Sequence, residues 1–243
     1  MNGALALHPA SRRGMALVAV LLVSVLMGTV GLGLSLMLAI QHLAVRNARE
    51  SATLAYAAAA GLEIAARALD DADWQAVLAG TETAPDADGP PSGRRWLDGG
   101  DTIDLDVQTH LANCGAPAAC SAGALQAVTS DRPWGANNPT WRLFLYGPLA
   151  TLAPFERAPS VYVLVWAADD GREQDDDPDR DGAATGGAGA RILLLRAVAV
   201  GRGGGRRGFE AEAARICRAG PGGPGCQPGI RVQSWRDLRW SVP

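Results

Sequence analysis

An uncharged apolar segment near the N terminus constrains this chain more than any other feature. It covers Met15–Ile40 and contains no Asp, Glu, Lys or Arg. As an α-helix rising about 1.5 Å per residue, it is long enough to cross a bilayer core of roughly 30 Å. The pair Arg12-Arg13 precedes it, whereas the basic residues that follow start at Arg46 and are diluted by Glu50. This charge bias predicts a cytoplasmic N terminus, with the bulk of the chain outside the cytoplasm.

A cleavable export signal fits the N-terminal segment less well than a membrane anchor does. A cleaved secretory signal, with a small-residue site near Leu38-Ala39, usually has an apolar region of about 7 to 15 residues, and this one is far longer. A twin-arginine signal fits Ser11-Arg12-Arg13, but Gly14-Met15-Ala16 lacks the bulky apolar residues that should follow the arginines.

The junction between the basic leader and the apolar segment resembles that of a known protein class. Arg12-Arg13-Gly14, followed by Met15, is similar to the class III leader junction of type IV prepilins. The resemblance implies that residues 1–14 form a leader, that a prepilin peptidase cuts after Gly14, and that Met15 becomes the methylated N terminus. The segment Ala44–Leu69 likewise resembles the N-terminal helix of PilX-type minor pilins.

One departure from the major pilins is informative. Those proteins carry a Glu at the fifth mature position, where this chain has Ala19. A carboxylate inside a membrane is costly unless it is partnered, so Ala19 removes both a cost and a docking contact. In pilin-like families the missing Glu is typical of subunits at the filament tip.

The helix is expected to continue beyond the membrane. Apolar residues recur at intervals of three and four, which is amphipathic helical periodicity, and they are Leu54, Ala58, Leu62, Ala65 and Leu69. We therefore predict a membrane helix over 15–40 and its periplasmic continuation over 41–79. Residues 80–101 are rich in Gly, Pro, Asp and Thr, which predicts a linker.

The remaining residues, 102–243, predict a small β-rich domain. Short β-type runs occur at 102–110, 141–146, 161–166, 191–200, 208–216 and 230–235. They indicate one antiparallel sheet. The expected fold class is therefore α+β, with a long N-terminal transmembrane and amphipathic helix followed by a pilin-like sheet domain.

The cysteines fall into two local pairs, Cys114 with Cys120 and Cys217 with Cys226. Three pairings are formally open, and we expect local pairing into disulfides in an oxidising compartment. The spacings do not match the usual intervals between zinc-binding cysteines, which argues against zinc.

An acidic loop over 169–181 is the strongest chemical constellation in the chain. Its carboxylates at alternate positions before Gly182 are the candidate ligands of a calcium ion, and they are Asp175, Asp177, Asp179 and Asp181. A true EF-hand is excluded, because its twelfth position would be Ala188. A solvated acidic turn between two strands stays an equal alternative. The stretch 161–211, which includes this loop, resembles the C-terminal part of some PilX-like pilus assembly proteins.

Nothing in the sequence indicates an enzyme or a nucleic-acid-binding protein. The histidines are His8, His42 and His110, so a histidine-based site outside the membrane would depend on His110 alone. The net charge of −3 gives no basic footprint for nucleic acid.

The resemblance implies a minor pilin-like subunit that helps initiate a type IV pilus at or near its tip. Its expected partners are prepilin peptidase, other minor and major pilins through the N-terminal helix, and the lipid bilayer. Its expected location is the inner membrane, single-pass, and the extracellular pilus after assembly. Two alternatives stay open: a tip-type pseudopilin of a type II secretion system, and a membrane-anchored periplasmic cation-binding module.

Overall fold

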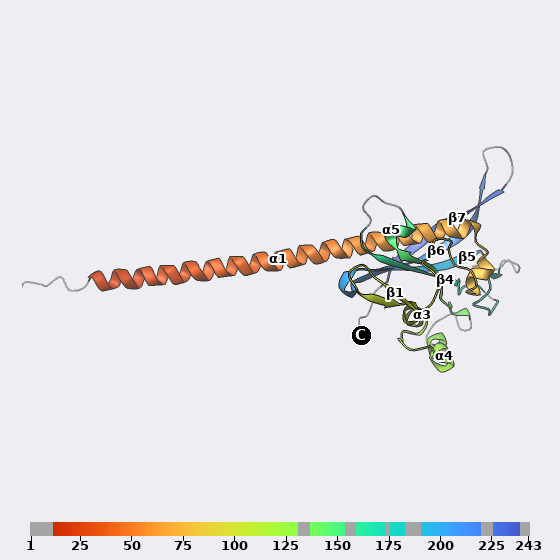
Figure 1. Cartoon of the computed structure of the whole chain (residues 1–243), viewed down its shortest axis with the longest axis horizontal. Coiled ribbons are helices and arrows are strands. Elements are labelled where there is room, and N and C mark those ends of the chain that lie inside the picture. Colours follow the sequence, from red (N-terminus) through yellow and green to blue (C-terminus); the bar gives the residue numbers. More distant parts are fainter. Residues whose placement is uncertain are drawn as a thin grey trace, which may run out of the picture. The chain divides into compact units, whose positions relative to one another are not determined.

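The computed structural model describes residues 12–130, 137–153, 159–173, 175–182, 191–219 and 226–238. A long helix, α1 (Arg12–Asp71), is followed by short helices and an antiparallel sheet (Figure 1). The α+β fold class predicted from the sequence is therefore confirmed. The chain divides into an N-terminal unit, Met1–Arg49, and a head unit, Glu50–Pro243.

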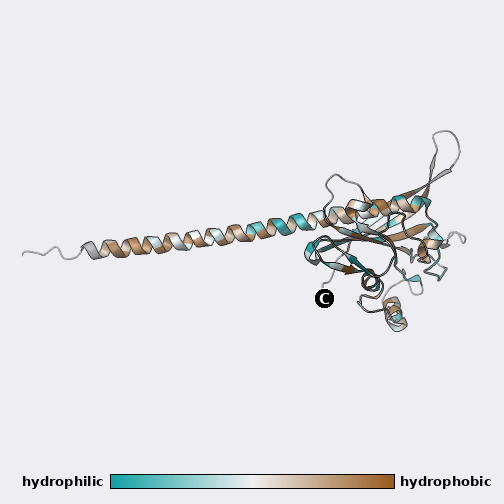
Figure 2. Cartoon of the chain, in the orientation of Figure 1, coloured by the Kyte–Doolittle hydropathy of each residue, from teal (hydrophilic) through white to brown (hydrophobic). Residues whose placement is uncertain are grey.

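In the N-terminal unit, α1 exposes every described side chain from Met15 onward. Figure 2 shows apolar residues along most of this part of the helix, and by length and composition it is a candidate membrane span. Its few hydroxyls are satisfied internally: Ser24 donates to the Val20 carbonyl and Ser35 to the Gly31 carbonyl, both at 2.9 Å. A helix in lipid has this requirement, because no water is present to bond its polar groups.

In the head unit, the remaining turns of α1 bury the predicted apolar stripe. The exposed fractions are small, at 3% for Leu54, 0% for Ala58, 3% for Leu62, 0% for Ala65 and 0% for Leu69. A Cβ added to Gly61 would lie 2.4 Å from Cγ1 of Val163, so a glycine at this position allows the helix to approach the sheet closely. The amphipathic periodicity therefore correctly predicted the face of α1 that packs on the head.

The predicted continuation of the helix to residue 79 is wrong at its end. α1 stops at Asp71, and a separate helix, α2 (Trp74–Leu78), begins after an N-cap at Asp73 whose side chain accepts from the Gln75 amide. The indole of Trp74 donates to the Leu69 carbonyl at 3.1 Å, which satisfies one of the acceptors left over at a helix end.

The main sheet has five strands in the order β3-β4-β5-β6-β7, with each neighbouring pair antiparallel. The strands confirm the last five predicted runs, and their bounds are β3 (Arg142–Pro148), β4 (Tyr162–Asp169), β5 (Ile192–Val200), β6 (Arg206–Ala219) and β7 (Cys226–Asp237). β4 is buried along its whole length, because both faces of the sheet are covered. Val163 and Val165 join the core beneath α1, while Leu164 and Trp166 join a second core on the opposite face.

The first predicted strand, 102–110, is mostly helical. Only β2 (Thr102–Asp104) is a strand, and it pairs with β1 (Arg94–Trp96) inside the predicted linker. The side chain of Asp104 accepts from the Val107 amide at 3.2 Å and caps α3 (Leu105–Cys114). This cap favours a helix, although the alternation of polar and apolar residues fits a strand equally well.

Two further elements were not predicted from the sequence. They are the short helices α4 (Ala122–Ser130) and α5 (Leu149–Leu152). The 3₁₀ turn η3 (Arg202–Gly204) joins β5 to β6.

Candidate functional site

The predicted processing site lies at the start of α1. The described backbone is helical through Gly14 and Met15, and Met15 is 74% exposed. From Met15 to Ile40 the N-terminal unit therefore presents apolar side chains with no described burial partner. A surface of this kind is unfavourable in water, in agreement with a candidate membrane span.

The four predicted calcium ligands do not gather around one point. Asp179 forms an ion pair with Arg142 at 2.9 Å, and Asp181 accepts from the Arg191 amide at 2.8 Å. Asp177 is exposed and accepts from the Asp179 amide at 3.2 Å. Of the four, Asp175 alone belongs to the carboxylate cluster found in the described part of the chain.

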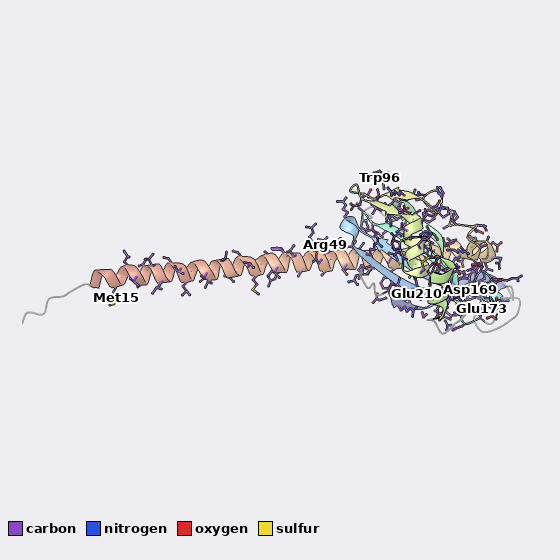
Figure 3. All side chains as sticks on the ribbon, turned by 90° about the horizontal axis from the view of Figure 1, so that it is seen from below. Met15, Arg49, Trp96, Asp169, Glu173 and Glu210 are labelled. Atoms are coloured by element: carbon purple, nitrogen blue, oxygen red, sulfur yellow. A yellow bond between two sulfur atoms is a disulfide. The ribbon has the colours of Figure 1, made fainter. Side chains whose placement is uncertain are left out.

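That cluster consists of Asp169, Glu173 and Asp175, and one carboxylate oxygen of each lies within 4.8 Å of the others. Asp169 is the last residue of the buried strand β4, and Glu173 and Asp175 follow in the loop towards β5. Figure 3 shows Asp169 and Glu173 next to each other in the head unit. Asp169 is 1% exposed and Glu173 is 5% exposed. We call these three residues the carboxylate cluster.

Most oxygens of the carboxylate cluster have no hydrogen-bond partner. Both carboxylate oxygens of Asp169 are buried and unpartnered, as are Oε1 of Glu173 and Oδ2 of Asp175. Buried polar groups are normally hydrogen-bonded, and a buried charge is costly unless it is paired or coordinates a metal. Oxygen atoms of this kind can bind a hard cation or hold a proton.

The pKa values of the cluster reflect this environment. Burial, together with the nearby charge of Glu173, raises the pKa of Asp169 to about 9. Burial also raises the pKa of Glu173 to about 7, and the charges of Asp181 and Asp175 add to the effect. Each acid is thus harder to ionise because it is desolvated and because other carboxylates lie nearby.

The backbone around the cluster fixes Glu173. The amide of Gly182 donates to Oε2 of Glu173, and a Cβ at Gly182 would lie 2.4 Å from that oxygen. The side-chain amide of Asn137 donates to the Glu173 carbonyl. Asn137 is 4% exposed and its own Oδ1 has no partner. The loop therefore holds Glu173 in place through backbone contacts without neutralising its carboxylate.

The adjacent acid, Asp170, shows the contrast. It is 3% exposed, but Arg172 donates to its Oδ1 at 3.2 Å, so its charge is paired.

Asp169 and Glu173 were not predicted as ligands from the sequence, because the alternation of aspartates lies further along the loop. The available signal was the placement of Asp169 directly after an uninterrupted apolar run.

Of the two predicted disulfides, one is confirmed. Cys114, the last residue of α3, is bonded to Cys120, with 6.0 Å between the Cα atoms. The preceding turn of α3 carries His110, whose carbonyl oxygen lies 3.4 Å from the Cys114 sulfur. In the β6–β7 register Cys217 pairs with Pro228 and Cys226 with Ala219. The side chains of these two cysteines lie outside the described residues, so their bridge stays a prediction.

No family model, curated protein or solved structure matches this chain.

Proposed function

We propose that this chain is a minor pilin-like subunit of a type IV pilus that helps initiate assembly at or near the filament tip. The observation that carries the proposal is the change of surroundings along the single helix α1. Its residues from Met15 to Arg49 are exposed, and the apolar ones form a membrane-length surface. Its residues from Leu54 to Leu69 bury one face beneath the sheet.

This arrangement suits a subunit that moves from a bilayer into a filament. The apolar surface of α1 is solvated by lipid before assembly and by neighbouring helices afterwards, so it never has to enter water. Cleavage after Gly14 would remove the basic leader that holds the N terminus on the cytoplasmic side. The proposed first location is thus the inner membrane, and the proposed second location is the pilus.

The tip position follows from Ala19, which lies on the exposed apolar surface of α1. With a methyl group in place of a carboxylate, this position carries no charge into lipid and offers no ion pair to the N-terminal amine of a neighbour. A subunit without that contact is best placed where no neighbour has to be bound in this way. Prepilin peptidase, other pilins and lipid are the proposed partners, and no catalytic reaction or nucleic-acid ligand is assigned.

Between β2 and β3 the described helices are α3 and α4, of 10 and 9 residues. A tip-type pseudopilin would be favoured by a larger inserted helical domain. The short helices therefore favour the pilus subunit over the secretion pseudopilin.

The test is intact-mass and N-terminal analysis of the protein from membranes of cells with and without prepilin peptidase. We expect a chain that begins at N-methylated Met15 only when the peptidase is present. Gly14→Val should block the cut. The matched control is Gly28→Val on the same helix, where an added Cβ meets no atom within 4 Å, and it should be processed normally. An uncut chain in the presence of peptidase, or one that begins after Ala39, would favour an anchored or secreted periplasmic module instead.

A further inference from the structure

The carboxylate cluster in the head unit brings three acids together, with no positive partner among the described residues. Two arginines that contact this region are engaged by other acids: Arg172 pairs with Asp170 and Glu212, and Arg142 pairs with Asp179. Asp169 is 1% exposed and neither of its carboxylate oxygens has a partner. A fully buried acid with both oxygens unsatisfied points to a ligand that compensates its charge.

The geometry and chemistry of the cluster select the type of ligand. Its donor atoms are carboxylate oxygens, which hard cations prefer, and none of its members is a cysteine or a histidine. Oxygens bound to one calcium at 2.3–2.6 Å lie at most about 5 Å from one another. One carboxylate oxygen of each member lies within 4.8 Å of the others, a separation that falls within this range. Magnesium, with ligands at about 2.0–2.1 Å and a strict octahedral geometry, is less well suited.

A neutral oxygen next to the cluster supports the same ligand. The side-chain nitrogen of Asn137 donates to the backbone carbonyl of Glu173, which places its amide group beside the backbone of a cluster residue. The amide oxygen is buried and unpartnered. Calcium sites commonly combine carboxylates with amide or backbone carbonyl oxygens. This residue belongs to a different segment of the chain, so it is an observation independent of the acidic loop.

We propose that Asp169, Glu173 and Asp175 bind one calcium ion, with the amide oxygen of Asn137 as a neutral ligand. The ion joins the end of β4, the following loop and the segment before β3. That loop also carries Asp179, whose side chain contacts Arg142 of β3. The backbone carbonyl of Asp179 accepts a hydrogen bond from the side chain of Gln75 of α2 at 2.8 Å. Calcium therefore fixes the loop against two other elements of the head unit. The site does not depend on the pilus function.

The experiment is calorimetric titration of the full-length protein in detergent with calcium chloride, after removal of metal by a chelator. We expect one ion to bind per chain, magnesium to bind at least tenfold more weakly, and the melting temperature to rise with calcium. Asp169→Asn keeps the shape of the side chain and removes its charge, and it should weaken calcium binding at least tenfold. The matched control is Asp177→Asn, an exposed acid of the same loop outside the cluster, which should bind calcium as the wild type does.

The absence of calcium binding to the wild type would overturn the proposal, and so would equal binding by the wild type and Asp169→Asn. Equal affinity for magnesium would contradict the assignment to calcium. If Asp169→Asn fails to fold, Glu173→Gln serves as the second variant, with the same expected loss. The wild type in calcium and in chelator is informative by itself, because equal melting temperatures in the two conditions also contradict the proposal.

Discussion

Two acids on the same sheet, Glu210 and Asp169, are buried to a similar degree, but only Glu210 has arginine partners for its carboxylate. Glu210, on β6, is 7% exposed, and Arg196 donates to its Oε2 from Nη2 at 2.9 Å and from Nε at 3.2 Å. Arg236 donates to its other oxygen. Asp169, at the end of β4, is 1% exposed and has no described partner for either oxygen.

The difference separates a structural acid from an acid that needs a ligand. Arg196 is itself held in place, because its guanidinium lies 4.0 Å from the ring centroid of Trp141 and donates to the Ala112 carbonyl at 2.9 Å. The charge of Glu210 is therefore compensated within the chain. The charge of Asp169 is not, so this group must take up a proton or a cation from outside.

The largest expected effect comes from removing the inner partner of Glu210. Arg196→Met leaves a buried carboxylate with Arg236 alone, and breaking a buried pair in this way typically costs about 3–5 kcal/mol. The free energy of unfolding, measured by urea denaturation of the full-length protein in detergent, should fall by an amount in this range. The double variant Arg196→Met with Glu210→Leu should recover most of the loss, because the uncompensated charge is gone. A loss below about 1 kcal/mol in the single variant would mean that Glu210 does not need its partner.

Substitution of Asp169 should raise the free energy of unfolding when calcium is removed, in contrast to the loss expected for Arg196→Met. In chelator, Asp169→Asn replaces a buried group that resists ionisation by a neutral group of the same shape, which should raise the free energy of unfolding by roughly 1–3 kcal/mol. In excess calcium the order should reverse, because only the wild type keeps the ion. Urea denaturation in both conditions provides the measurement. If the variant is less stable than the wild type in chelator, Asp169 has a structural role, as Glu210 does.

The pairing of Glu210 could not be predicted from the sequence, whereas the strands that carry this acid and its partner could. The stripe from Leu54 to Leu69 and the five strands of the main sheet follow from local periodicity, which a sequence displays directly. The strand predicted over 102–110 was wrong because the N-cap at Asp104 overrides an alternating pattern. The partnership of Glu210 with Arg196 depends on the β5–β6 register, which is a tertiary property.

The carboxylate cluster was predicted in part. Acid-rich composition drew attention to the loop, and Asp175 belongs to both the predicted ligands and the carboxylate cluster. Asp169 was missed because its role depends on burial at the end of β4, and Asn137 was missed because it lies in another segment of the chain. Asp179 and Asp181 fit the spacing of calcium ligands. In the structure, however, Asp179 forms an ion pair with Arg142, and Asp181 accepts a hydrogen bond from the Arg191 amide.

The pH dependence of stability without calcium tests the same comparison. The folded-state pKa of Asp169 is raised to about 9 and that of Glu173 to about 7, above the unfolded values of about 4. The folded state thus binds more protons, so this contribution is complete below about pH 4 and is lost as the pH rises through 7 and 9. In chelator the free energy of unfolding should fall with rising pH, by at most about 1.4 kcal/mol per pH unit for each group. Between pH 7 and 9 the slope comes from Asp169, so Asp169→Asn should flatten it there, and an unchanged slope would contradict the assignment.

The smallest effect is expected at the outer partner of Glu210. Arg236 contacts the same carboxylate as Arg196, but its side chain is 75% exposed, compared with 15% for Arg196. An exposed arginine is screened by water and loses side-chain entropy when it is held, so Arg236→Ala should cost about 0.2–1 kcal/mol in the urea measurement. The loss should shrink further in high salt, since exposed ion pairs are screened. A cost equal to that of Arg196→Met would show that Glu210 depends on both arginines, and the pairing of this acid would then be a network rather than one buried ion pair.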